Sequence, residues 1–426
     1  MNIFSTSARF IGGRAPIASL GPATPAPGPA AVQAVHELRT QKPHYDYRID
    51  FFRGLSLIFI FINHIPDNFY SYFTSRTFAL FDSAEVFMFL AGYSAALAYY
   101  SLLPQGLQAF ARKAVVRART MLLYHMVLVV IIMTAAYVLI SAGVKTDYEV
   151  FIDKIESDPL QVIAGVPTLA FQAPLLDILP MYIMVILIAP FLIWLRAQSE
   201  LALLSVSGMM WMFAARFFPA IPTVTYDVNW FFNPFCWQFL FAIGLIFGWR
   251  ARTSMPPVAA GASRRVLDIC CALFVIFSAC VLMTIAFETI DFAASNRLRA
   301  MYFSLNKQSL DLWRVVGLLA SAYLVARLIS KNSEWLRTKP AGWVCAAGSF
   351  SLPIFSLTVV LSFAGKFFVK AMGPDYWILA DTLATGAGLF IMLIVAQLLR
   401  RGLFQRLAES VFAPVSRPPS QQRQTG

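Results

Sequence analysis

The chain has 426 residues, of which 58% are hydrophobic and 13% charged, and its mean hydropathy is +0.66. Soluble domains are about 45–50% apolar and about 25% charged, so this composition excludes an ordinary water-soluble fold. The formal net charge of +12 comes from basic residues that lie between apolar blocks, which is typical of membrane proteins and not of a nucleic-acid-binding face. We therefore expect a membrane protein whose partner is the lipid bilayer and not nucleic acid.

The two ends of the chain differ from its middle. Residues 1–45 are rich in Ala, Pro and Gly and lack the apolar stretch of a signal peptide, so they predict a disordered cytoplasmic tail. Residues 406–426 predict a short second cytoplasmic tail, and residues 46–405 predict a membrane domain. Ten apolar segments in that domain reach, or nearly reach, the length that spans a bilayer. They are residues 49–65, 83–103, 121–141, 174–195, 201–218, 235–249, 267–287, 312–329, 342–365 and 377–399.

The distribution of lysine and arginine orients these spans. With the N-terminus in the cytoplasm, the two tails and the even-numbered connections hold 23 of the 34 Lys and Arg residues, whereas the outer connections hold nine. Cytoplasmic loops are enriched in basic residues. The expected fold is therefore an all-α polytopic membrane protein of about ten transmembrane helices, with both termini inside.

The first span carries three ionisable side chains. Asp50 and Arg53 lie near its inner end, and His64 lies at its outer end, eleven residues after Arg53 and on nearly the same helix face. Ionisable groups at membrane depth are costly and usually face a bundle interior or a wet cavity. A purely structural alternative remains open, in which Asp50 and Arg53 form an anchoring i,i+3 pair and His64 caps the helix.

The second span begins with two carboxylates, Asp82 and Glu85, on one helix face. Because this helix runs back from the outer side, both carboxylates are expected at the depth of His64. A carboxylate beside a histidine fixes its tautomer and stabilises the imidazolium, so His64, Glu85 and Asp82 are the candidate catalytic residues of a general base. Small residues at 91–96 predict close packing of this helix against a neighbour.

A basic cluster follows at the inner side, at residues 112–125. Positive-inside anchoring explains it without a ligand. The alternative is a phosphate site, because arginine binds phosphate in a bidentate manner. The candidate residues for binding a phosphorylated donor substrate are Arg53, Asp50, Arg117, Arg119 and His125.

Polar and aromatic residues also gather at the expected outer side. Trp and Tyr are routine at membrane interfaces, so sugar binding is the alternative to a simple interfacial belt. The candidate acceptor-binding residues are Asn63, Asp67, Arg76, Asp177, Trp230, Trp237 and Lys307. The long outer connection 142–173 predicts a solvated amphipathic helix, and the five cysteines lack metal-ligand spacing, so no metal is expected.

These residues resemble a known pattern. An Arg-Gly pair followed by a histidine eleven residues after the arginine is similar to the first-helix signature of the membrane-bound acyltransferases that use acyl-coenzyme A. More closely, the chain resembles the OpgC family, which succinylates osmoregulated periplasmic glucans. The motifs that carry this resemblance are D-F-F-R-G-L-S-L-I-F-I-F-I-N-H-I-P-D-N (50–68) and F-D-S-A-E-V-F-M-F-L-A-G-Y-S-A-A-L-A-Y (81–99), with support from 177–182, 232–244 and 351–355.

The resemblance implies a ten-helix acyltransferase of the bacterial inner membrane. It implies succinyl-coenzyme A as co-substrate on the cytoplasmic side, no bound cofactor, and a periplasmic glucan as acceptor, with glucan-presenting periplasmic proteins as further partners. His64 is then the catalytic base, Arg53 lies on the donor path, and Asp50, Asp82 and Glu85 have active-site roles.

The chain also departs from the family pattern. Gly317 stands where a family histidine is expected, residues 348–353 lack an expected basic residue, and residues 112–119 do not reproduce the R-x-x-R of the wider acyltransferases. The acyl group and acceptor therefore stay open, and O-acetylation or another acylation of a different surface glycan is the alternative. A transporter or flippase would use the same intramembrane charges, although we find none of the internal repeats that transporters commonly show.

Overall fold

The computed structural model describes residues 46–218, 220–225, 228–253, 261–286 and 305–402. The predicted tails, 1–45 and 406–426, lie outside these described residues. Within the described ranges the regular structure is helical, and the β-structure is limited to one isolated bridge between Pro222 and Asn229. The all-α fold class is therefore confirmed for this part of the chain.

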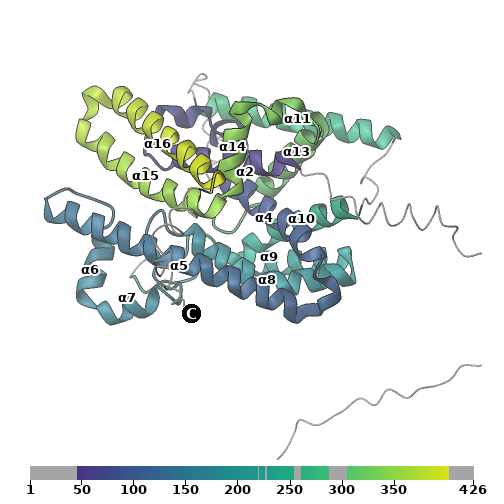
Figure 1. Ribbon diagram of the computed structural model, residues 1–426, viewed down its shortest axis with the longest axis horizontal. Coiled ribbons are helices and arrows are strands. Elements are labelled where there is room, and N and C mark those ends of the chain that lie inside the picture. The colour runs from purple at the N-terminus through teal and green to yellow at the C-terminus, as the bar shows by residue number, and fades with distance from the viewer. Residues whose placement is uncertain (1–45, 219, 226–227, 254–260, 287–304, 403–426) are drawn as a thin grey trace, which may run out of the picture. The chain divides into compact units, whose positions relative to one another are not determined.

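Long helices form most of the bundle in Figure 1. They are α2 (Tyr47–Asn63), α4 (Ser83–Tyr100), α5 (Gly106–Ser141), α8 (Ile178–Gln198), α9 (Glu200–Phe217), α10 (Pro234–Arg252), α11 (Gly261–Ala286), α13 (Leu312–Leu328), α14 (Lys339–Ser349), α15 (Ser351–Met372) and α16 (Trp377–Arg400). Short elements connect them, namely η1 (Phe69–Phe73), α3 (Ser75–Phe78), η2 (Leu103–Gln105), α6 (Glu149–Ser157), α7 (Pro159–Gly165), η3 (Glu334–Arg337) and η4 (Pro374–Tyr376).

Nine of the ten predicted spans overlap one long helix each. The predicted span 342–365 is wrong as a single helix, because it covers part of α14 and part of α15, which are separated at Phe350. Among the described residues, six segments are long and apolar enough to cross a membrane, so the chain is a membrane protein. They are Gly106–Ser141, Ile178–Gln198, Pro234–Arg252, Gly261–Ala286, Ser351–Met372 and Pro374–Arg400. The remaining predicted spans correspond to α2 and α13, with 17 residues each, and to α4 and α9, with 18 each.

These four helices are short for spanning a membrane. At 1.5 Å per residue, a helix of this size extends about 26 Å, which is slightly less than the hydrocarbon core of about 30 Å. All four also carry charged side chains, such as Arg53 in α2, Glu85 in α4, Glu200 in α9 and Arg314 in α13. The count of ten transmembrane helices, and the orientation with both termini inside, therefore stay predictions.

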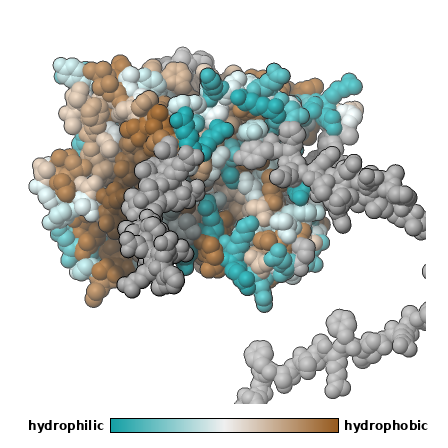
Figure 2. Space-filling model, viewed as in Figure 1, coloured by the Kyte–Doolittle hydropathy of each residue, from teal (hydrophilic) through white to brown (hydrophobic). Residues whose placement is uncertain are grey.

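The outer surface of the bundle is suited to lipid. Large apolar side chains are exposed along α5, α9, α11 and α16, including Val130, Phe213, Phe277 and Phe390. Figure 2 shows apolar side chains gathered on the left of the visible face, where polar ones are sparse. Exposed apolar area on this scale indicates contact with the bilayer, because water would penalise it.

Glycines allow α4 and α10 to pack side by side at very short range (Figure 1). A Cβ atom at Gly92 of α4 would overlap the carbonyl oxygen of Phe241, and one at Gly244 of α10 would overlap that of Phe89. Small residues let two helix backbones approach closely where lipid surrounds them. The close packing predicted from residues 91–96 is thereby confirmed.

Close packing through glycines also joins α2 to α14. A Cβ atom at Gly54 would overlap the carbonyl oxygen of Val344, and one at Gly348 would overlap that of Asp50. The first helix is thus fixed against α14 near its beginning, while its other end is left to carry His64.

We predict that Gly92→Ala destabilises the protein. The added methyl group cannot be placed without moving α10, and overpacking of this kind costs about 1–3 kcal/mol. The measurement is the melting temperature of the full chain in detergent. Gly386→Ala in α16 is the matched control, because nothing lies within 4 Å of a Cβ built there, and alanine favours a helix over glycine. Equal losses in the two variants would contradict this packing.

Candidate functional site

A cavity of about 650 Å³ lies at the end of the bundle where α2 ends and α4 begins, which we call the His64 end. The cavity brings together side chains that are distant in the sequence. Six of the predicted site residues line it, namely Asn63, His64, Arg76, Asp82, Asp177 and Lys307. One wall of the cavity, which we call its roof, is formed by the connection between α5 and α8, including Phe151 of α6 and residues 172–175.

His64 is the residue directly after α2, and its imidazole ring is held by the helix itself. Its Nδ1 lies 2.6 Å from the carbonyl oxygen of Ile60. A carbonyl oxygen can only accept a hydrogen bond, so Nδ1 carries the hydrogen and donates it. In the neutral ring this leaves a lone pair on Nε2, the atom that a general base needs.

Glu85 has other partners than His64. It is fully buried; its Oε1 accepts a hydrogen bond from Nε of Arg314 at 2.6 Å, and its Oε2 accepts one from the backbone N–H of Asp82 at 3.0 Å. Glu85 and Asp82 thereby form the capping box of α4, because the first turn of a helix has N–H groups without helical acceptors.

The predicted orientation of His64 by a carboxylate is therefore not what the described hydrogen bonds show. Within the described residues neither Glu85 nor Asp82 bonds to the ring, and the Ile60 carbonyl orients it instead. The catalytic roles of Glu85 and Asp82 stay predictions.

Asp82 nevertheless reaches His64 through the neighbouring residue. Its Oδ1 accepts hydrogen bonds from the backbone N–H of Ser83 at 2.6 Å and, at 3.4 Å, from Nδ2 of Asn63. The Oδ1 of Asn63 in turn accepts a hydrogen bond from the Thr74 hydroxyl at 2.8 Å. Asn63 precedes His64 directly, so this network ties the end of α2 to the start of α4.

Lys307 completes this network from the segment before α13. Its ammonium group lies 2.9 Å from Oδ2 of Asp82. Burial alone would raise the pKa of Asp82, but the charge of Lys307 and hydrogen bonds from Lys307 and Ser83 outweigh it and hold that pKa well below its usual range. Burial likewise opposes the charge on Lys307, but Asp82 and Glu85 raise the pKa of its ammonium group. The ion pair therefore persists at neutral pH.

The predicted stacking tryptophans do not line the cavity. Trp230 and Trp237 are 8% and 0% exposed, and Nε1 of Trp237 donates to the carbonyl oxygens of Lys307 and Gln308, at 3.1 Å each. Trp237 therefore supports the Lys307 segment from behind, where its polar N–H finds partners. The exposed Asp67 is not part of the lining either.

Several phenylalanine rings do line the cavity. Three of them, Phe151, Phe231 and Phe232, come from connections between the long helices and were not predicted as site residues. Gln172 is a further lining residue that the sequence did not indicate. These residues lie in connections, where no apolar periodicity marks a side chain as inward-facing.

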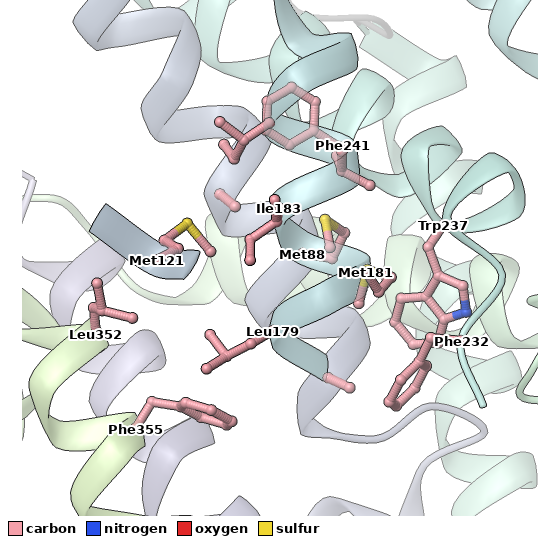
Figure 3. Packing of buried hydrophobic residues seen from close by; sticks show 14 of the residues in the cluster. Met88, Met121, Leu179, Met181, Ile183, Phe232, Trp237, Phe241, Leu352 and Phe355 are labelled. Atoms are coloured by element: carbon pink, nitrogen blue, oxygen red, sulfur yellow. The ribbon is translucent and has the colours of Figure 1, made fainter. Parts of the chain in front are cut away.

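A narrow crevice of about 20 Å³ continues from the cavity into the bundle. Ala84, Ile178 and Phe355 line both spaces, and the crevice extends to Ser351 of α15 and Arg117 of α5. Figure 3 shows the apolar side chains around it, with Leu179, Leu352 and Phe355 among those labelled. Its volume is close to the space that a single water molecule needs.

Of the five predicted donor-binding residues, Arg117 lines this crevice. Asp50 accepts a hydrogen bond from the Ser349 hydroxyl at 2.9 Å, and Arg53 donates to the carbonyl oxygen of Leu90 at 3.1 Å, so both contact neighbouring helices. Arg119 is exposed, and His125 is fully buried without a hydrogen-bond partner among the described residues. Their donor-binding roles stay predictions.

Comparison with known proteins adds one finding. A family model described as OpgC protein matches residues 45–402, which include every residue that lines the cavity and the crevice. Searches of curated proteins and of solved structures gave no match. Within the described residues, no group of three or more His, Cys, Asp or Glu side chains could hold a metal ion.

We predict that Arg314→Leu strongly destabilises the protein. The substitution leaves the Glu85 carboxylate buried without its partner, which costs about 3–5 kcal/mol. Thermal unfolding of the full chain in detergent measures this loss. The double variant Glu85→Gln/Arg314→Leu should recover part of it, because the uncompensated charge is gone.

Arg327→Leu is the matched control. Arg327 pairs with Asp268 near the surface, where the two side chains are 45% and 30% exposed, so the loss of this pair should lower the melting temperature much less. A melting temperature of Arg314→Leu equal to that of Arg327→Leu would show that the buried pair does not hold the start of α4.

Proposed function

The chain belongs to the OpgC family, and on that premise we propose that it is an acyltransferase that moves a succinyl group from succinyl-coenzyme A to a hydroxyl of a periplasmic glucan. The observation that carries the proposal is His64. Its ring is oriented by the Ile60 carbonyl so that Nε2 keeps its lone pair, and it stands in a cavity large enough for a sugar.

In the proposed reaction His64 acts as general base and then as general acid. Its Nε2 takes the proton from a glucan hydroxyl while the hydroxyl oxygen attacks the thioester carbonyl. The tetrahedral intermediate then expels the thiolate of coenzyme A, which receives the proton from Nε2. A thioester is already activated, so no covalent acyl-enzyme is needed. Such acid–base assistance typically contributes about 10²–10⁴-fold.

The crevice supports a donor that approaches from the opposite end of the bundle. Arg117 at its far end can bind a phosphate of coenzyme A, and the crevice follows α15 from Ser351 to Phe355, where the cavity begins. From Ser351 to Ser362, both of which line this path, α15 rises about 16 Å. Donor entry requires side chains such as Leu352 and Phe355 to move, because the crevice is now nearly closed.

The charges in the cavity support an acidic acyl group. Arg76, Lys307 and Arg314 line the cavity, and Lys307 and Arg314 also pair with Asp82 and Glu85. The free carboxylate of a succinyl group can share these cations. An acetyl group offers no charge for them. O-acetylation of another surface glycan is therefore the weaker alternative.

The proposed location is the bacterial inner membrane, with Arg117 facing the cytoplasm and the cavity facing the periplasm. The lysine and arginine distribution supports this orientation. It lets the acyl group cross while coenzyme A stays on the cytoplasmic side. Glucan-presenting periplasmic proteins are further proposed partners.

We predict that His64→Ala abolishes succinylation of the glucan and leaves membrane insertion intact. The variant is expressed in a strain that lacks the gene, and the charge and mass of the isolated periplasmic glucans are compared. Asp375→Asn is the control, because its side chain is exposed near the end of α15, at the His64 end but outside the cavity. Full succinylation by His64→Ala would remove the general-base assignment. If the wild-type protein attaches acetyl groups to the glucans in place of succinyl groups, the alternative acyl donor is favoured.

A further inference from the structure

Gln172 is a buried residue of the cavity roof whose side chain is only half satisfied. It is 3% exposed, and its Nε2 donates to the carbonyl oxygen of Leu169 at 3.1 Å. Its Oε1 is buried and has no hydrogen-bond partner among the described residues. The side chain also lines the cavity that holds His64.

The orientation of this amide follows from its one hydrogen bond. Because Nε2 is used on Leu169, Oε1 is the half of the amide that is left without a partner among the described residues. A buried acceptor without a partner costs about 1–3 kcal/mol, and buried polar groups in native proteins are rarely left in this state. The Oε1 atom of Gln172 therefore needs a hydrogen-bond donor, which the described residues do not supply.

The backbone around Gln172 is held in place by neighbouring segments. Leu169 and Leu175, on either side of it, have positive φ values of 64° and 68°. A left-handed conformation at a branched residue is strained and persists only where surrounding contacts enforce it. Here the carbonyl of Ala170 accepts a hydrogen bond from the Val224 N–H at 2.9 Å, and the Phe171 N–H donates to Gly165 at 3.0 Å.

We propose that Oε1 of Gln172 accepts a hydrogen bond from a hydroxyl of the acceptor sugar, so that Gln172 selects the acceptor at this site. This inference rests on the proposed function, since the hydroxyl belongs to the glucan. An amide oxygen is a neutral acceptor and attracts an O–H donor, whereas a carboxylate or phosphate presents only acceptors to it. The residue therefore recognises the sugar and not the acidic end of the acyl group.

The surroundings of Gln172 fit a sugar. Phe151, Phe231 and Phe232 line the same cavity and offer apolar ring surfaces. Carbohydrate C–H faces can pack on such rings, while the hydroxyls at the rim of the sugar need polar partners. A site built to bond a hydroxyl rejects ligands that lack it, because its own polar group is then left unpaired.

The test compares Gln172→Leu with Gln161→Leu in the full chain, reconstituted in nanodiscs. Gln161 lies on α7 in the same outer connection, with its side chain exposed and outside the cavity, so the two substitutions are chemically identical. The probe is periplasmic glucan stripped of its substituents. Both its dissociation constant and the steady-state kinetics with succinyl-coenzyme A are measured.

We expect Gln172→Leu to raise the Kd and the KM for glucan by about 10- to 100-fold. The kcat at saturating glucan and the KM for succinyl-coenzyme A should stay within about threefold, because a bond made equally in ground and transition states changes KM and not kcat. The melting temperature without glucan should not fall by much, because the unpaired acceptor is removed as well. Gln161→Leu should match wild type throughout.

Two outcomes would overturn the inference, and they are distinguishable. If wild type transfers succinyl groups and Gln172→Leu keeps the wild-type Kd and KM for glucan, the sugar does not use Gln172, and the inference fails alone. If wild type neither binds the glucan nor transfers to it, the proposed acceptor is wrong and the inference fails with it.

Discussion

The structure of the site depends on the way two carboxylates at the start of α4 meet two cations from the segment before and within α13. Asp82 pairs with Lys307, and Glu85 pairs with Arg314, while the same carboxylates cap the first turn of α4. Uncompensated charges in this environment would be very costly, so the four groups require each other. The pairing fixes elements that are more than 200 residues apart in the sequence.

The fixed start of α4 also sets the position of the base. Asp82 bonds to Asn63, and His64 comes directly after it, with its ring held by the carbonyl of Ile60. Asp82 thus positions the backbone next to His64, whereas the carbonyl of Ile60 in α2 sets the tautomer of the ring. Beneath it, Phe355 lies at the boundary between the wide cavity and the narrow crevice. This division suits a reaction whose two substrates arrive from opposite sides.

Features that depend on local pattern and charge were predicted well from the sequence. The helical class, the close approach at Gly92 and the gathering of His64, Asp82, Asp177 and Lys307 in one cavity are consequences of helix periodicity and antiparallel neighbours. The features that were missed depend on tertiary contacts. Trp237 is buried behind Lys307, and no single-sequence signal distinguishes it from an interfacial tryptophan.

Gln172 could not be predicted for the same reason. Its importance arises from an oxygen atom without a partner among the described residues, in a connection whose backbone is held by Val224 and Gly165. The predicted count of ten spans stays a prediction, because six described segments are long and apolar enough to cross a membrane, and α2 and α13 have 17 residues each.

The central claim is that an acyl group crosses the bundle while its carrier does not. The most direct measurement uses proteoliposomes in which the protein is oriented with Arg117 facing outward. Unsubstituted glucan is enclosed inside, and succinyl-coenzyme A, labelled in the succinyl group, is added outside. The account predicts labelled glucan inside and an equal amount of free coenzyme A outside. Labelled succinyl-coenzyme A found inside, or glucan exported without label, would contradict it and identify a transporter.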